Sequence, residues 1–270
     1  MQPPRLIALD MDGTLLGPDH QVTPRGEAAI RGLTEAGVVV ALATGRPTRM
    51  TTSFVHDLGL EYGIVFNGAA CYRASDASVD YHHAMDRETG LRVIERLRTR
   101  LPEIRLGMET EHGWYLDPVL EERRRSVPRL AAYAPPDGVG AIEDFVQQRI
   151  VKVFARHPEL GADQMAEALE DIDVYCTWTL LELLEVMHGE VNKREAIKHL
   201  GASLGIAREE IAAFGDGHND VQAIEWAGWG VATANASEAA RAAADEVTAS
   251  NEDDGVAQVL ERWLAEIRGA

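Results

Sequence analysis

Short apolar runs alternate with longer amphipathic segments in the first part of the chain. Residues 6–9 and 38–43 are entirely apolar, which is typical of strands buried on both faces in a parallel sheet covered by helices. Between these runs, Thr23 is a suitable helix N-cap, apolar residues follow at helical spacing, and Gly37 ends the segment. A third short apolar run occupies residues 64–66. This part of the chain therefore predicts a β-α-β unit followed by a third strand.

The same alternation returns in the last part of the chain. It predicts a strand at residues 211–214, a helix at 219–227, another strand at 229–232 and a final helix from about Gly255. The final segment places its apolar residues on one helical face, as expected for a helix that covers a sheet. Strands and helices that alternate in this way predict an α/β core with a parallel sheet.

The middle of the chain has a different pattern. Residues 116–141 include four prolines and two glycines, and the pattern there permits no assignment of elements. Elsewhere we predict a helix that carries Leu91, Ile94, Leu97 and Leu101, strands at 104–108 and 150–155, a helix at 162–172, and paired strands at 174–178 and 181–186. The simplest architecture is an α/β fold with a doubly wound, Rossmann-like parallel-sheet core, residues 1–83 and 188–270, interrupted by a smaller α+β domain, residues 84–187.

Composition narrows the class of protein. The chain has 26 Lys and Arg against 44 Asp and Glu, a formal charge of −18, which argues against a nucleic-acid partner because such proteins neutralise phosphates with clustered cations. The longest plain apolar run, 38–43, is far shorter than the ~20 residues of a membrane-spanning helix, and we expect no signal peptide. Cys71 and Cys176 are too few for a disulfide framework. We expect a soluble, cytoplasmic protein without a membrane partner, and its oligomeric state stays unknown.

Polar side chains gather where the predicted core strands end. In open parallel sheets, ligands bind outside the carboxyl ends of the strands, so we expect these groups to share one crevice. They are Asp10-Met11-Asp12-Gly13-Thr14 after the first strand, Thr44-Gly45-Arg46 after the second, Gly215-Asp216-Gly217-His218-Asn219-Asp220 after the strand at 211–214, and Lys193 at the start of a helix that leads back into the core.

Several carboxylates in one crevice favour a bound metal ion. They would raise one another's pKa unless a divalent cation lay among them, and oxygen ligands favour a hard ion such as Mg²⁺. Lys193 and the backbone N–H groups after Asp10 and Thr44 would then face an anion, for which a phosphoryl group is suited. A carboxylate ~4 Å from a phosphate dianion is repelled by about 8 kcal/mol at an effective dielectric of about 20. An acidic nucleophile therefore needs both Mg²⁺ and Lys193.

These motifs resemble those of the haloacid dehalogenase (HAD) superfamily, in particular the Cof-like phosphatases with a large α/β cap. Both the order of the motifs and their places at strand ends match. Asn67-Gly68-Ala69 resembles the substrate-side turn of that subfamily, and the segment between Thr44 and Lys193 is long enough for its cap. One departure is Thr233-Ala234-Asn235-Ala236, where the family commonly has Met-Gly-Asn-Ala. The resemblance implies a Mg²⁺-dependent phosphatase of small phosphorylated metabolites, sugar phosphates first among them.

The resemblance also implies a role for each matching residue. Asp10 would be the nucleophile that forms an aspartyl-phosphate, and Asp12 would be the general acid and then the general base. Mg²⁺ would be held by Asp10, by Asp12 through its backbone carbonyl, and by Asp216, with Asp220 supporting Lys193 or the metal. The contacts to phosphate and substrate would come from Met11, Thr44, Gly45, Arg46, Asn67, Gly68, Lys193 and Asn219.

Other interpretations stay open beside this one. Arg46 could contact phosphate or pair with a neighbouring acid. His82 and His83 suggest a metal site, but adjacent residues on a strand point to opposite faces, so we interpret them as exposed hinge residues. Trp114, Tyr115 and Trp178 are interpreted as packing residues, with stacking on a sugar or an aromatic substrate as the alternative. A phosphomutase would use the same aspartyl-phosphate while excluding water, and a non-catalytic phosphate-binding protein is a third alternative.

Overall fold

A computed structural model describes residues 3–131, 134–146, 149–178 and 181–269, which form two compact units. Unit 1 comprises Met1–Asp80 and Asn192–Ala270, and unit 2 comprises Tyr81–Val191. The domain predicted at residues 84–187 falls within unit 2. Within the described part of the chain, every helix is too short or too polar to cross a membrane.

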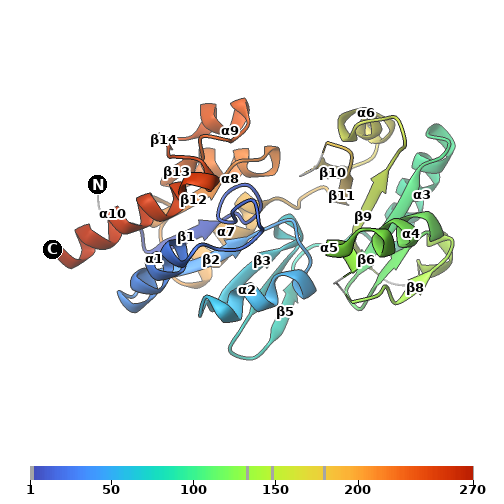
Figure 1. Ribbon diagram of the computed structural model, residues 1–270. Coiled ribbons are helices and arrows are strands. Elements are labelled where there is room, and N and C mark those ends of the chain that lie inside the picture. The colour runs from blue at the N-terminus through green and yellow to red at the C-terminus, as the bar shows by residue number, and fades with distance from the viewer. Residues whose placement is uncertain (1–2, 132–133, 147–148, 179–180, 270) are drawn as a thin grey trace. The chain divides into compact units, whose positions relative to one another are not determined.

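Unit 1 is built on a mainly parallel sheet (Figure 1). Its strands are β1 (Leu6–Leu9), β2 (Val39–Ala43), β3 (Tyr62–Val65), β4 (Ala70–Arg73), β5 (Ser78–Tyr81), β12 (Ile211–Gly215), β13 (Trp229–Ala232) and β14 (Glu246–Val247). They lie in the order β14-β13-β12-β1-β2-β3-β4-β5. Strands β14 to β3 pair in parallel, whereas β4 joins β3 in antiparallel fashion. The carboxyl ends of β12, β1 and β2 therefore meet at one edge of the sheet.

Helices cover both faces of this sheet. They are α1 (Pro24–Glu35), α2 (Thr52–Asp57), α7 (Lys193–Ser203), α8 (Val221–Trp226), α9 (Glu238–Ala243) and α10 (Gly255–Gly269). On β1, Ile7 and Leu9 pack in the cluster that holds α1 and α10, while Leu6 and Ala8 pack in the cluster that holds α7. Burial of alternate residues on opposite faces explains why the strand is continuously apolar. The predicted doubly wound core is confirmed.

The first predicted helix has the expected ends. The Thr23 hydroxyl accepts a hydrogen bond from the Gly26 N–H at 3.1 Å, and Pro24 occupies the first helical position. The helix ends at Glu35, and Gly37 follows with φ +86°, a conformation that glycine adopts without strain. Local capping chemistry therefore fixes both ends of this helix.

Unit 2 is a mixed sheet with helices. Its strands are β6 (Arg105–Thr110), β7 (Trp114–Leu116), β8 (Gly138–Val139), β9 (Ile150–Arg156), β10 (Val174–Thr177) and β11 (Leu184–His188), in the order β10-β11-β9-β6-β7-β8. Its helices are α3 (Arg87–Arg100), α4 (Pro118–Ser126), α5 (Pro128–Ala131) and α6 (Ala162–Ala166). A single apolar cluster joins α3 and α6 to β6, β9 and β11.

Several sequence predictions in the middle of the chain are wrong in extent. The helix predicted at 162–172 ends at Ala166, and a 3₁₀ turn at Glu167–Leu169 follows. The strand predicted from Leu181 begins at Leu184, and Leu181 is exposed. In the unassigned segment, Asp117 accepts the Leu120 N–H at 2.9 Å and caps α4. Asp-Pro is a helix start, so this signal was available in the sequence.

Candidate active site

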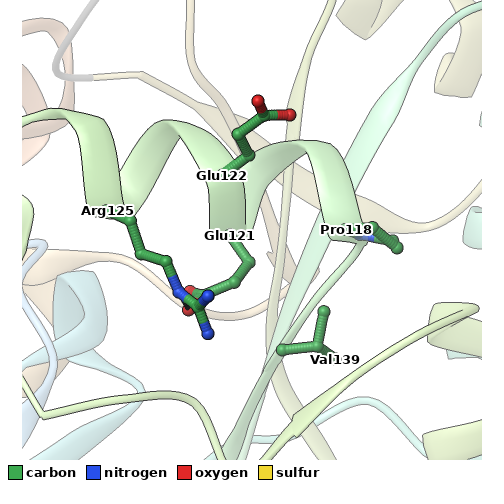
Figure 2. A pocket seen from close by; sticks show the side chains of 5 residues that line it. All are labelled: Pro118, Glu121, Glu122, Arg125 and Val139. Carbon is green, nitrogen blue, oxygen red and sulfur yellow. Dashed lines mark hydrogen bonds and ion pairs between the residues drawn. The ribbon is translucent and has the colours of Figure 1, made fainter.

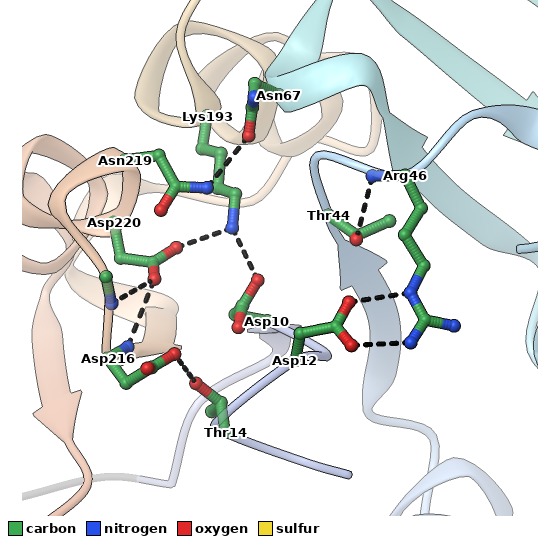
Figure 3. A network of polar contacts seen from close by, with 11 residues as sticks. Asp10, Asp12, Thr14, Thr44, Arg46, Asn67, Lys193, Asp216, Asn219 and Asp220 are labelled. Carbon is green, nitrogen blue, oxygen red and sulfur yellow. Dashed lines mark hydrogen bonds and ion pairs between the residues drawn. The ribbon is translucent and has the colours of Figure 1, made fainter. Parts of the chain in front are cut away.

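The predicted site residues of the core lie together at the carboxyl edge of the unit 1 sheet (Figure 3). Asp10 and Asp12 follow β1, Thr44 and Arg46 follow β2, and Asp216 follows β12. Lys193 is the first residue of α7, whose N-cap Asn192 accepts the Glu195 N–H at 2.9 Å. Asn219 and Asp220 lie in the 3₁₀ turn His218–Asp220. The parallel topology thus brings together groups that are far apart in the sequence.

A buried ammonium group lies between two carboxylates of the site. Lys193 Nζ donates to Asp10 Oδ1 and to Asp220 Oδ1, both at 2.6 Å, and only 1% of its side chain is exposed. Burial alone would lower the pKa of Lys193, but the charges of Asp10 and Asp220 outweigh burial and raise this pKa above its usual value. Lys193 is therefore a permanent positive charge beside Asp10.

Three carboxylates crowd this one lysine. One oxygen from each of Asp10, Asp216 and Asp220 lies within 4.8 Å of the others. Burial, and then the charge of Asp220, hold the pKa of Asp10 well above its usual range despite Lys193. Burial and Asp220 also raise the pKa of Asp216 to about 6, against the hydrogen bond from the Thr14 hydroxyl at 2.9 Å. An oxygen-only donor set with this excess of negative charge fits a hard divalent cation.

Asp220 shapes the loop that carries Asp216. Its Oδ2 atom accepts the backbone N–H groups of Asp216 at 3.1 Å and Gly217 at 2.9 Å, while Oδ1 accepts from Lys193. A Cβ atom at Gly215 would lie 2.3 Å from the Asp220 Cβ, so the loop needs glycine there. Because both oxygens of Asp220 already serve the lysine and the loop, Asp10 and Asp216 are the better placed pair to hold a cation.

The carboxylate of Asp12 is held by Arg46. Arg46 Nε donates to Asp12 Oδ2 at 2.6 Å, and Nη2 donates to Oδ1 at 2.5 Å. Of the two interpretations of Arg46, the structure supports pairing with a neighbouring acid. His20 Nδ1 also lies 3.6 Å from Asp12 Oδ1, and sequence reasoning missed this residue because it belongs to no motif. A positive φ of +59° places His20 in a turn, which a sequence pattern does not reveal.

A buried turn connects the ends of β2 and β3 with the acidic loop. Asn67 Oδ1 accepts from Asn219 Nδ2 at 2.9 Å, and the Asn67 N–H donates to the Thr44 carbonyl at 2.9 Å. The Thr44 hydroxyl accepts the Arg46 N–H at 3.1 Å. A Cβ atom at Gly45 would lie 3.0 Å from Asn67 Oδ1, so this glycine allows close packing. Thr44, Asn67 and Asn219 thus form one network, in which the Thr44 carbonyl and the Asn219 side chain hold the turn in place.

Two further residues at this edge correct the picture drawn from motifs. The Met11 side chain is buried in the hydrophobic core, so only its backbone could contact a ligand. Asn235 Nδ2 donates to the Gly13 carbonyl at 2.8 Å. Gly13 has φ +83°, and a Cβ atom there would lie 2.4 Å from Asp216 Oδ2. Asn235, in the run that departs from the family pattern, therefore supports the turn against which Asp216 packs.

A hollow of about 320 Å³ in unit 2 has a different character. It is lined by Pro118, Glu121, Glu122, Arg125 and Val139 (Figure 2). Arg125 Nε donates to Glu121 Oε1 at 2.6 Å, so the positive charge on its wall is paired with one of the two carboxylates there. This lining brings together neither an acid cluster nor a phosphate-binding loop. The core residues are therefore the stronger candidate site.

Two aromatic side chains of unit 2, Trp114 and Tyr115, serve packing, as predicted. Trp114 is buried with Leu116 and Leu120, and its Nε1 donates to the Pro135 carbonyl at 3.1 Å. Tyr115 stacks on Phe145 with ring centroids 4.7 Å apart.

Known proteins resemble this chain along nearly its whole length. The sequence profile of the haloacid dehalogenase-like hydrolases matches residues 7–260. A pyridoxal phosphate phosphatase of Escherichia coli K12 is 30% identical, with 95% of this chain and 97% of that protein aligned. A 5-amino-6-(5-phospho-D-ribitylamino)uracil phosphatase of Bacillus subtilis 168 is 27% identical, with 97% and 98% aligned. The structure of a haloacid dehalogenase-like hydrolase from B. subtilis superposes with a TM-score of 0.83 at 25% identity, covering 95% of this chain and 99% of that one.

Proposed function

Because the chain belongs to the haloacid dehalogenase-like hydrolases and is a phosphatase of small phosphorylated metabolites, we propose that it hydrolyses sugar phosphates through an aspartyl-phosphate on Asp10. The observation that carries the mechanism is the buried contact between Asp10 and Lys193 at 2.6 Å. A carboxylate that attacks a phosphate must overcome charge repulsion, and a fixed ammonium beside it offsets part of that cost.

The proposed substrate class rests on what the relatives' substrates share. Pyridoxal phosphate and the phosphoribityl compound named for the relatives are both monoesters of a primary alcohol on a small polar molecule. Sugars phosphorylated on their terminal carbon have the same ester and a similar size. We therefore propose that such sugar phosphates are hydrolysed faster than esters of secondary alcohols.

In the proposed first step, a carboxylate oxygen of Asp10 attacks phosphorus and the bond to the ester oxygen breaks. Asp12 passes a proton to the leaving oxygen, and the monoanionic form of the ester supplies that proton. Lys193, Thr44 and the backbone N–H groups after Asp10 are proposed to hold the phosphoryl oxygens. What supports these roles is that all of them lie at the same sheet edge.

In the proposed second step, water attacks the phosphorus of the aspartyl-phosphate. Asp12 accepts the proton of that water as the bond from phosphorus to Asp10 breaks, and then passes this proton to the phosphate, which leaves as the monoanion, so that both carboxylates are restored. The two N–H groups of Arg46 favour the carboxylate form of Asp12. This arrangement supports Asp12 as the base of the second step.

The carboxylates also fit the Mg²⁺ that this family typically uses. We propose Asp10 and Asp216 as side-chain ligands, with the Asp12 carbonyl as a third and Asp220 as their support. When bound, Mg²⁺ supplies positive charge that reduces the repulsion between Asp10 and the phosphate. Lys193 supplies further positive charge through its contact with Asp10 Oδ1.

The test is phosphate release from a hexose 6-phosphate, a ribitol phosphate, pyridoxal phosphate and a secondary phosphate ester, with and without Mg²⁺. We expect Asp10→Asn to lower kcat by roughly a thousandfold or more, because an amide is a poor nucleophile. Asp57→Asn, at an exposed position at the end of α2, is the matched control and should keep full activity.

Each part of the proposal can fail separately. Turnover that survives in Asp10→Asn would contradict the covalent mechanism. An isomeric sugar phosphate as product, in place of free sugar and inorganic phosphate, would identify a mutase. A higher kcat/KM for pyridoxal phosphate than for every sugar phosphate would overturn the substrate class and leave the mechanism intact.

A further inference from the structure

A second group of potential metal ligands lies within unit 2, where its chain begins and ends. His83 follows β5, His188 is the last residue of β11, and Glu190 lies in the turn after it. The interpretation of His82 and His83 as exposed strand residues is wrong, because both are half-buried and neither is in a strand. Their predicted place at a hinge agrees with the boundary between the two units, which falls between Asp80 and Tyr81. The tertiary fold therefore gives His83 surroundings that a strand pattern does not predict.

The sheet of unit 2 explains why these segments meet. Met85 exchanges backbone hydrogen bonds with Ile150, the first residue of β9, at 2.8 and 2.9 Å. Strand β11 also pairs with β9, in antiparallel fashion. The chain entering unit 2 and the chain leaving it are thus both attached to β9, although they are far apart in the sequence.

The three side chains converge. One donor atom from each of His83, His188 and Glu190 lies within 4.8 Å of the other two. His83 Nδ1 is 3.6 Å from Glu190 Oε2, and the two imidazole rings face each other with centroids 5.5 Å apart and planes inclined by 20°. A direct ion pair at 3.6 Å involving the exposed Glu190 contributes little stability by itself.

We propose that His83, His188 and Glu190 form a binding site for a borderline divalent metal ion, of which Zn²⁺ is the representative. Two imidazole nitrogens and one carboxylate oxygen are a donor set that suits Zn²⁺, Co²⁺ and Ni²⁺ better than Mg²⁺. Three protein ligands leave room in the coordination sphere for water. The site differs in chemistry from the oxygen-only group of the core, which suits a hard ion.

A hydrogen bond to the ring of His188 opposes metal binding. The Glu190 N–H donates to His188 Nδ1 at 3.3 Å, a long hydrogen bond that orients the ring. A metal bound at Nδ1 replaces this bond, which weakens binding relative to a fully prepared site. In return, the ion fastens the entering and leaving segments of unit 2 together and stabilises the folded form by mass action.

The experiment uses the full chain, stripped with a chelator and then held in excess Mg²⁺ so that the carboxylates of the core are occupied. Zn²⁺ is titrated by calorimetry, and Co²⁺ by its visible absorption, which reports imidazole ligation. We expect one high-affinity Zn²⁺ per chain and a rise in melting temperature. His83→Gln and Glu190→Gln should each lower Zn²⁺ affinity at least tenfold, and His82→Gln, the matched control, should leave it unchanged.

The same titration can overturn the proposal. Zn²⁺ affinity that is equal in the wild type, His83→Gln and Glu190→Gln would exclude the site. Affinity lost only in Asp216→Asn would assign the Zn²⁺ to the core carboxylates. Glu190→Gln guards against misfolding as an explanation, because this side chain is 74% exposed and its replacement leaves the packing of unit 2 intact.

Discussion

Arg46 holds the carboxylate of Asp12 through shape as well as charge. Its guanidinium offers two parallel N–H donors that match the two oxygens of Asp12, and it lies 5.4 Å from the centre of the Phe54 ring. Lysine would keep the charge but could not form this fork or the same contact with the ring. The position of Asp12 therefore depends on a residue type, and this dependence can be measured.

We expect Arg46→Lys to lower kcat by roughly ten- to a hundredfold while KM changes little, because a displaced Asp12 impairs proton transfer and not binding. Steady-state kinetics on the best substrate measure this. Arg5→Lys alters an exposed pair with Glu210 and should leave kcat unchanged. A rise in KM with kcat preserved would show that Arg46 contacts phosphate instead.

The turn between β3 and β4 has an unusual backbone conformation. Phe66, Asn67 and Gly68 all have positive φ, and a Cβ atom at Gly68 would lie 2.5 Å from the Asn192 carbonyl oxygen. Strain of this kind is common at functional sites. Here it brings the turn against the start of α7, from which Lys193 projects.

Gly68→Ala should therefore lower the free energy of unfolding by about 3 kcal/mol, because it combines an unfavourable φ with a backbone clash. Gly59→Ala is the matched control: φ is +67° but nothing lies within 4 Å of the new Cβ, so a loss of only about 1 kcal/mol is expected. Urea denaturation compares the two. Equal losses would mean that the contact with Asn192 is easily relieved.

In unit 2, a buried ion pair joins β9 to β11. Lys152 Nζ donates to Glu185 Oε1 at 2.5 Å, and both side chains are less than a tenth exposed. Lys152→Met should cost about 3–5 kcal/mol of stability, because it leaves a buried carboxylate without its cation. The double variant Lys152→Met, Glu185→Leu should recover most of that loss. A double variant as unstable as the single one would contradict this account.

At the scale of the whole molecule, the site carries more negative charge than its own cationic side chains balance. The protein carries a formal charge of −18, and burial raises the pKa of both Asp10 and Asp216, the latter to about 6. Without metal, the carboxyl groups of Asp10 and Asp216 hold their protons more tightly in the folded state than in the unfolded state. The stability that Asp216 contributes in this way is complete below about pH 4 and is lost as the pH rises through about 6. The raised pKa of Asp10 gives a contribution of the same sign.

Mg²⁺ should reverse this trend, because it binds the deprotonated carboxylates. We expect the rise in melting temperature on adding Mg²⁺ to be small at about pH 5 and larger at about pH 7.5, measured against a chelator-treated sample. Asp216→Asn should reduce both the Mg²⁺ effect and the loss of stability with rising pH. An equal Mg²⁺ effect at both pH values would place the ion away from these carboxylates.

The sequence by itself determined the core architecture and predicted which polar residues would gather at one edge of the core sheet. Strands buried on both faces must be continuously apolar, and polar residues just after β1, β2 and β12 must meet at one edge, so local patterns sufficed for Asp10, Thr44 and Asp216. The bounds of the short strands and helices in the middle segment were not predicted correctly, because turns and tertiary packing, more than periodicity, limit their length.

Only the tertiary structure decided which groups touch across the chain. In the folded chain, Arg46 pairs with Asp12, and His20 lies beside them. His83 meets His188 because the segments that carry them are both attached to β9. Hydrophobic periodicity specifies which face of an element is buried, but not which side chain of a distant element lies opposite. Side-chain partners are therefore a property of strand order and register, which no single segment encodes.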